Sequence, residues 1–141
     1  MATIEKAIEI AAKAHAGMLD KAGEPYIFHP LRMMMRMTST EAKIVAVLHD
    51  VVEDSDATLD WLRAEGFSEE VVAAVDGVTD RKHLGESYDD FVERASKNPI
   101  SREVKIADLE DNMNMLRLDK VEQKQLDRLE KYHRSWLKLK G

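Results

Sequence analysis

Cysteine is absent from this 141-residue chain. That absence excludes disulfide bonds, thiolate metal sites and cysteine nucleophiles together. Any metal ion would have to be bound by His, Asp and Glu side chains. A chain of this length can bury a stable hydrophobic core without disulfide bonds or a structural metal ion. We expect residues 1–141 to form a single domain.

Long apolar segments are also lacking. The longest ones are too short, and too often interrupted by charged residues, to span a bilayer. Residues 1–6 do not have the shape of a signal peptide. We therefore expect a cytoplasmic protein with no membrane partner.

The formal net charge of −6 argues against a surface that binds nucleic acid. It does not argue against a small phosphorylated ligand, because a metal ion and a few Lys or Arg side chains can balance such a ligand locally. Acidic residues gathered at a metal site would themselves contribute to the negative total.

Internal repeats, low-complexity tracts and convincing strand alternation are absent, whereas apolar residues recur every three or four positions. The sequence therefore predicts an all-α fold, a bundle of about eight helices. The expected helices cover approximately residues 4–15, 31–37, 40–54, 58–66, 68–78, 87–97, 101–115 and 121–140. A flexible, charged loop is expected at 80–86, where it could lie over a pocket.

The helix expected at 40–54 carries four side chains that can bind a metal or transfer a proton: His49, Asp50, Glu53 and Asp54. At about 100° per residue they project within less than half of the helix circumference. An ionised carboxylate among apolar residues is costly unless it is paired or bound to a cation, so this group indicates a cation. The alternative is an acidic helix end that faces water, with an ordinary core histidine.

Two other segments offer further ligands. His29 lies at the entrance of the next expected helix, and Pro30 restricts its backbone as a rigid ligand requires. Asp108 lies in a helix stretch expected to be buried, although an exposed position is the alternative. Two imidazoles and two carboxylates can bind one divalent transition metal ion and leave positions open for water. The set is His29, His49, Asp50 and Asp108.

Two further residues have less specific interpretations. His15 occupies the last apolar-face position of the first expected helix, where a histidine satisfied by a backbone carbonyl is the favoured interpretation. Lys21 follows in a loop and is a candidate phosphate contact, with a solvated lysine as the alternative.

The ordered pattern of His, then His-Asp, then Asp on helices resembles the HD superfamily of metal-dependent phosphohydrolases. It is more closely similar to the hydrolase domain of RelA/SpoT-type stringent-response proteins and to the stand-alone small alarmone hydrolases. The motifs that carry this resemblance are Ala14-His15-Ala16-Gly17, Gly23-Glu24-Pro25-Tyr26-Ile27-Phe28-His29-Pro30, Leu48-His49-Asp50-Val51-Val52-Glu53-Asp54, Val75-Asp76-Gly77-Val78-Thr79 and Lys105-Ile106-Ala107-Asp108 with Asn112-Met113.

The resemblance implies that a single metal ion, manganese in this family, is bound by His29, His49, Asp50 and Asp108. It also implies that the Glu53 and Asp54 pair acts on the nucleophilic water, and that Lys21 and Asn112 contact a nucleotide with Tyr26 beside them. The family reaction removes pyrophosphate from the 3′ position of (p)ppGpp and gives GDP or GTP. The implied partner is thus a small phosphorylated nucleotide.

The chain departs from the family pattern at positions near the implied nucleotide. Asp20-Lys21-Ala22 stands where the family commonly has Arg-Lys-Ser, and Leu109 and Asp111 stand where it usually has Arg and His. These departures leave the metal set intact and keep two alternatives open. One is a hydrolase of another phosphorylated nucleotide, such as a nucleoside monophosphate or NADPH, and the other is a catalytically silent nucleotide-binding module.

Overall fold

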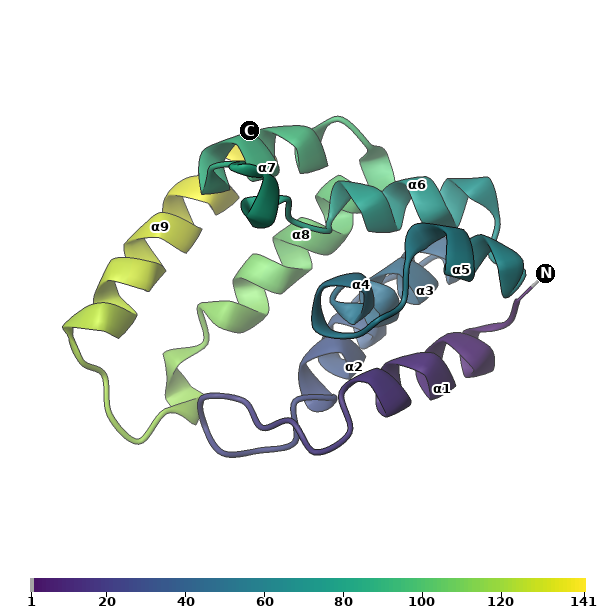
Figure 1. Cartoon of the computed structure of the whole chain (residues 1–141). Coiled ribbons are helices and arrows are strands. Elements are labelled where there is room, and N and C mark those ends of the chain that lie inside the picture. Colours follow the sequence, from purple (N-terminus) through teal and green to yellow (C-terminus); the bar gives the residue numbers. More distant parts are fainter. Residues whose placement is uncertain (1) are drawn as a thin grey trace.

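The computed structural model describes residues 2–141 as helices joined by short loops (Figure 1). This part of the chain contains no strand, only an isolated bridge between Leu19 and Pro25, so the predicted all-α fold is confirmed. None of its helices is long and apolar enough to cross a membrane. The elements are α1 (Ile4–Ala14), α2 (Phe28–Met35), α3 (Thr40–Leu48), α4 (Val51–Asp54), α5 (Leu59–Ala64), α6 (Glu69–Gly77), η1 (Lys82–Leu84), α7 (Tyr88–Ser96), α8 (Pro99–Asn112), η2 (Met115–Arg117) and α9 (Gln123–Lys140).

Several helix starts are set by capping side chains that the sequence made visible. In four helices the hydroxyl oxygen of the N-cap residue accepts a hydrogen bond from a backbone N–H of the first turn. These N-cap residues are Ser39, Thr58, Ser68 and Ser87. Helix α8 begins two residues before the expected position, because Asn98 caps it and Pro99 occupies its first position. Helix α2 likewise begins before Pro30, so that His29 lies in its first turn.

The expectation of one uninterrupted helix through residue 54 is wrong, because α3 ends at Leu48 and α4 begins at Val51. The Ala46 carbonyl, which would accept the Asp50 N–H in a continuous helix, instead accepts from the His49 backbone N–H (3.4 Å) and faces His49 Nδ1 at 2.7 Å. His49 and Asp50 consequently lie in the turn between the two helices, and Glu53 and Asp54 lie in α4.

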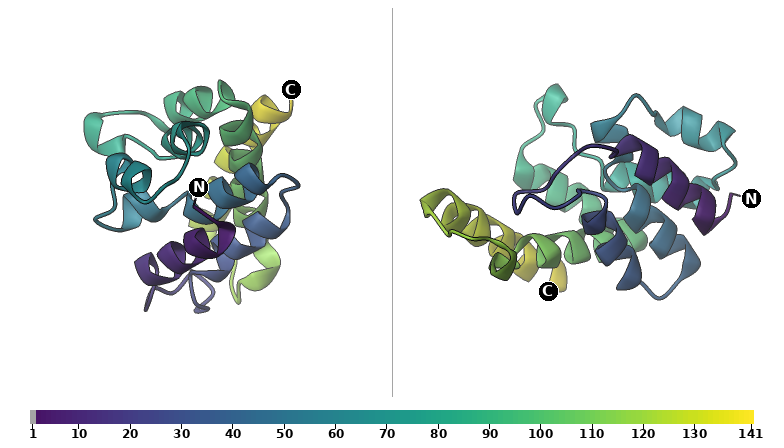
Figure 2. Two further views of the ribbon diagram at one scale, coloured as in Figure 1. Left: turned by 90° about the vertical axis from the view of Figure 1, so that its right-hand side faces the viewer. Right: turned by 90° about the horizontal axis from the view of Figure 1, so that it is seen from below.

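Helix α3 is the centre of the main core. Every residue from 44 to 48 is buried, and α3 packs against α1, α2, α6 and α8. A smaller apolar cluster of Val92, Leu109 and Leu139 joins α7, α8 and α9. Figures 1 and 2 show α9 alongside α8, on the far side of the molecule from α1. The α8 helix therefore connects the main core to the C-terminal helix.

Gly77, the last residue of α6, lies against Ser101 of α8. A Cβ atom there would overlap the Ser101 hydroxyl, which itself donates to the Ala74 carbonyl at 2.7 Å. Only glycine fits this contact without moving α8, the helix that carries Asp108.

Candidate metal centre

Four side chains expected from the sequence meet at one buried point. His29 comes from α2, His49 and Asp50 from the turn between α3 and α4, and Asp108 from α8. One ligand atom from each of the first three lies within 4.8 Å of the others. Asp108 Oδ1 lies 3.0 Å from His29 Nε2 and 3.6 Å from His49 Nε2. The residues thus converge as a single-metal site would require.

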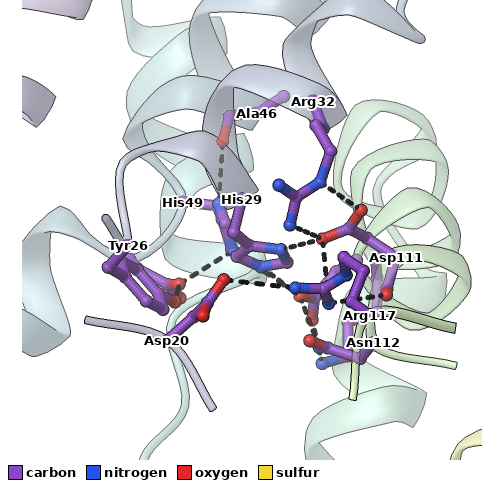
Figure 3. Close-up of polar contacts among 12 residues, drawn as sticks. Asp20, Tyr26, His29, Arg32, Ala46, His49, Asp111, Asn112 and Arg117 are labelled. Atoms are coloured by element: carbon purple, nitrogen blue, oxygen red, sulfur yellow. Dashed lines mark hydrogen bonds and ion pairs between the residues drawn. The ribbon is translucent and has the colours of Figure 1, made fainter. Parts of the chain in front are cut away.

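The outer contacts of the two imidazoles show which ring nitrogens face this point (Figure 3). His49 Nδ1 lies 2.7 Å from the Ala46 carbonyl oxygen, a contact that requires a proton on Nδ1. His49 Nε2 is buried 3.0 Å from Asp50 Oδ2 and makes no hydrogen bond within residues 2–141. A nitrogen lone pair and carboxylate oxygens that face one another are the donor set of a divalent cation.

The electrostatics of the centre favour positive charge at this point. Burial lowers the pKa of His49, but the carboxylates of Asp50 and Asp108 outweigh it and raise this pKa well above its ordinary value. The same balance, with Asp108 and Asp111 as the acceptors, raises the pKa of His29. Protons on the imidazoles and a metal ion are alternative ways to balance these carboxylates.

Asp108 is held in place by two groups on its own helix. Lys105 Nζ donates to Asp108 Oδ2 at 2.9 Å, and the Asn112 amide donates to Oδ1 at 3.0 Å. Lys105 is itself buried, with its ammonium 4.6 Å from the centre of the Phe91 ring and 5.1 Å from that of Tyr88. Burial raises the pKa of Asp108, but Lys105 and the two imidazoles lower it well below the usual range.

Asp50 has a partner of its own. The Tyr26 hydroxyl donates a short hydrogen bond to Asp50 Oδ2. Burial and the neighbouring Asp50 charge strongly raise the pKa of Tyr26, so its phenol stays protonated and can donate. Tyr26, expected beside a nucleotide, therefore also fixes the carboxylate of a candidate ligand.

The sequence did not identify the residues that hold His29. Asp111 Oδ2 lies 2.6 Å from His29 Nδ1, and Arg32 donates to both Asp111 oxygens at 2.8 and 2.9 Å. A carboxylate on the outer nitrogen of a ligating imidazole orients the ring and increases its basicity. The signal that could have found this group is spacing, because Arg32 and Asp111 each lie three residues beyond a candidate ligand.

Glu53 and Asp54 line different cavities. Glu53 lines the cavity of about 180 Å³ that also contains His29, His49, Asp50 and Asp108. The Asp80 backbone N–H donates to Glu53 Oε1 at 2.8 Å. The Glu53 side chain still reaches solvent, but partial desolvation in the cleft and the Asp50 charge raise its pKa to about 7.

Asp54 instead lines a neighbouring cavity of about 330 Å³, and Asp54 Oδ2 lies 3.7 Å from His15 Nδ1. His15 is buried, and neither of its ring nitrogens has a hydrogen-bond partner within residues 2–141. The expectation that a backbone carbonyl satisfies His15 is therefore wrong. Its imidazole faces Asp54 instead and packs 4.9 Å, centre to centre, from the Tyr26 ring.

The larger cavity contains the remaining expected contacts. Lys21 and Asn112 both line it, and Tyr26 and Asn112 lie on the boundary that it shares with the metal centre. Partial burial and the nearby charges of Arg128, Lys131 and Lys124 lower the pKa of Lys21. The cavity is thus bordered by cations although the whole chain is acidic.

The segment at 80–86 is held by ion pairs. It contains η1, and Arg94 donates to both oxygens of Glu86 at 2.9 Å and to the Thr79 carbonyl at 2.7 Å. The Arg81 backbone N–H donates to the same Glu86 carboxylate. These contacts fix the chain next to Asp80 and so support the hydrogen bond to Glu53.

Most of this chain is similar in sequence to two curated proteins of bacteria. A guanosine-3′,5′-bis(diphosphate) 3′-pyrophosphohydrolase of Aquifex aeolicus is 32% identical over 123 residues, covering 80% of this chain and 18% of the relative. A GTP pyrophosphokinase of Streptomyces coelicolor is 35% identical over 143 residues, covering 92% of this chain and 17% of the relative. The chain therefore spans less than a fifth of either of these curated relatives.

A solved structure is similar along nearly the whole chain. It is described as a metazoan ortholog of SpoT that hydrolyzes ppGpp, and the match has a TM-score of 0.80 at 25% identity. The match covers 99% of this chain and 85% of that one. The family model described as HD domain matches residues 7–129. With most of its length matched by that model, this chain belongs to the HD-domain family.

Proposed function

We propose that this chain is a manganese-dependent phosphohydrolase that removes the 3′-pyrophosphate from (p)ppGpp and leaves GDP or GTP. The observation that carries the proposal is the convergence of His29, His49, Asp50 and Asp108. The relative from Aquifex aeolicus and the solved metazoan structure support the choice of substrate, since the printed description of each names this chemistry.

The proposed metal ligands are the two Nε2 atoms and the carboxylates of Asp50 and Asp108. Each is oriented by a second group: the Ala46 carbonyl for His49, Asp111 for His29, Tyr26 for Asp50 and Lys105 for Asp108. A divalent cation held by these residues would make water more acidic and would stabilise negative charge on a phosphoryl oxygen.

Glu53 is the proposed general base. The Asp80 N–H holds one of its carboxylate oxygens, which leaves the other to accept a proton from the attacking water. The pKa of Glu53 is about 7 without a cation at Asp50, and a cation there would lower it, so the carboxylate is available as a base at neutral pH. Asp54 has a different proposed role, which is to orient water or substrate on the side of the larger cavity, because His15 faces its carboxylate there.

The larger cavity is the proposed position of the nucleoside half of the substrate. Its volume of about 330 Å³ is within the range of small-molecule sites, and it shares Tyr26 and Asn112 with the metal centre. A substrate with its 3′ phosphates at the candidate ligands would extend past these two residues. Lys21 would then balance charge on the phosphates.

The test is a nucleotide panel with manganese-loaded protein: ppGpp, nucleoside monophosphates and NADPH, with pyrophosphate and orthophosphate measured separately. Pyrophosphate released from ppGpp alone supports the proposal. Orthophosphate released from another compound supports the second candidate, an HD-type hydrolase of a different phosphorylated nucleotide. The observation that favours this candidate is an acidic side chain, Asp20, among the residues that line the nucleoside cavity.

A catalytically silent nucleotide-binding module is the third possibility. Glu53 argues against it, because a protein that only binds nucleotide does not require a carboxylate with a raised pKa in the cavity of the candidate ligands. Absence of turnover with every nucleotide and with several divalent metals, in protein that binds ppGpp, would establish the silent module.

A further inference from the structure

Asp20 and Arg117 form an ion pair at the larger cavity although 97 positions separate them in the sequence. Arg117 Nη1 lies 3.2 Å from Asp20 Oδ2, and both side chains line the cavity. Figure 3 shows the pair beside Asp111 and Asn112, next to the imidazole of His29. The contact joins the loop after α1 to η2.

Asp20 is fixed by its own loop. Its Oδ1 accepts the backbone N–H groups of Ala22 and Glu24 at 2.9 and 3.0 Å, and the side chain is only 10% exposed. The Oδ2 atom is the one directed to Arg117. Because both oxygens already accept hydrogen bonds, the carboxylate serves to hold the arginine.

Arg117 keeps hydrogen-bonding capacity beyond that pair. Its Nη2 donates to the Asp111 carbonyl at 3.3 Å, whereas its buried Nε makes no hydrogen bond within residues 2–141. A guanidinium has five N–H donors in a rigid planar fork. The side chain is 29% exposed and borders the cavity, so part of this fork remains available to a ligand.

We propose that Arg117 is a specificity-determining residue for the nucleoside half of the substrate and that Asp20 is its positioning residue. The proposal rests on the function proposed above and names a recognition element within it. The fork suits a ligand with two adjacent acceptors, which a 5′-phosphate or the O6/N7 edge of guanine can provide. A ligand that leaves a buried donor unpaired binds more weakly, and this penalty creates selectivity.

The experiment compares Arg117→Gln, Arg117→Lys, Asp20→Asn and the Asp20→Asn/Arg117→Gln double variant. Affinities for GDP, ADP and guanosine are measured by calorimetry in the presence of manganese, and KM and kcat are measured with ppGpp. Arg63→Gln and Asp60→Asn are the matched controls, because that ion pair is of the same type (2.6 Å) and lies outside both cavities. Thermal melting checks the fold of each variant.

We expect Arg117→Gln to weaken GDP binding about tenfold and to raise KM similarly with little change in kcat. Asp20→Asn should have a smaller effect in the same direction. The double variant should resemble Arg117→Gln alone, since the asparagine then has no guanidinium to position. An equal loss for GDP and ADP assigns the contact to the 5′-phosphates, and a loss for GDP and guanosine but not ADP assigns it to the base.

The proposal would be overturned if Arg117→Gln bound GDP with wild-type affinity. It would also be overturned if the losses of GDP affinity in the two single variants added fully in the double variant. If Arg117→Gln does not fold, Arg117→Lys provides the test, because lysine keeps the charge and loses the planar fork. If wild-type protein does not cleave ppGpp but Arg117→Gln still binds GDP more weakly than wild type, the proposed function is refuted and the role of Arg117 in binding is retained. If Arg117→Gln cleaves ppGpp with the wild-type KM, the role of Arg117 is refuted and the proposed function is retained.

Discussion

Lys105 Nζ lies 2.9 Å from Asp108 Oδ2, and both groups are buried within one turn of α8. The ammonium also lies over the Phe91 and Tyr88 rings, so it is surrounded by one anion and two aromatic faces. Burial lowers the pKa of Lys105, but Asp108 and Tyr88 outweigh it and raise this pKa above its ordinary value. The lysine is therefore charged and serves as the permanent counter-ion of Asp108.

Replacing Lys105 by Met should destabilise the protein by about 3 kcal/mol, because a buried carboxylate is left unbalanced. Urea unfolding without added metal measures this change. Manganese should restore part of the lost stability, since the ion supplies positive charge to the same carboxylate. Lys138→Met is the control: it removes a surface pair with Glu93 and should change stability much less. Equal effects of the two substitutions would contradict the counter-ion role.

Manganese binding should depend on His49. We expect wild-type protein to hold manganese through gel filtration and to melt at a higher temperature with the ion, the gain being about 2.7 kcal/mol at a hundredfold excess over Kd. His49→Gln should lose both properties. His133→Gln should keep both, because His133 is exposed on α9. Metal analysis by mass spectrometry and thermal melting are the measurements, and stoichiometric manganese in His49→Gln would remove the proposed site.

Glu53→Gln should retain manganese and lose turnover by about 10²- to 10⁴-fold. A base must be deprotonated to act, so activity should rise as pH increases through the Glu53 pKa. That pKa is about 7 in the protein without a cation, and a cation at Asp50 would lower it. The wild-type pH–rate profile should show an acid limb at or below neutrality that the residual activity of Glu53→Gln lacks. Asp56→Asn, in the exposed loop after α4, should keep the wild-type profile.

Because of Asp111, the free energy of unfolding should decrease as the pH falls into the acid range. Burial raises its pKa, but the contacts with His29 and Arg32 outweigh this and hold the pKa far below its ordinary value. A carboxyl group whose pKa is depressed by folding stabilises the fold fully at pH values above its pKa in the unfolded chain, which is about 4. This stabilisation is lost as the pH falls from there toward the lower pKa of the folded protein. Asp111→Asn should therefore lose about 2 kcal/mol at pH 7 and less at pH 3. Asp119→Asn, an exposed control, should show no such pH-dependent loss.

Local signals in the sequence predicted the helical elements well, because capping side chains and apolar spacing act within one or two turns. Ser39, Thr58, Ser68 and Ser87 illustrate this. The break at His49 was missed because helical periodicity does not reveal the contact that accompanies it, between the His49 ring and the carbonyl three residues earlier. The convergence of His29 with Asp108 was expected because a buried carboxylate requires a nearby cation, and because the resemblance to the HD superfamily implies the same ligand set.

The supporting contacts were missed for a different reason. The carboxylate of Asp111 lies on His29 across 82 positions, and Arg117 lies on Asp20 across 97. Spacing could have marked Asp111 as a neighbour of the site, but no local pattern pairs it with His29 or pairs Arg117 with Asp20. Only the packing of α2, α8, η2 and the loop after α1 brings these groups together. Asp20 and Asp111, which appeared as departures from a family pattern, are the two carboxylates that Arg117 contacts.

The distance along the chain between the candidate ligands has a consequence for synthesis in the cell. His29 and Asp108 are 79 positions apart, and α8 carries the second of them. A ribosome must therefore have released the chain through α8 before the pocket can form. A bound ion would then join segments that are distant in the sequence only after those segments have packed together.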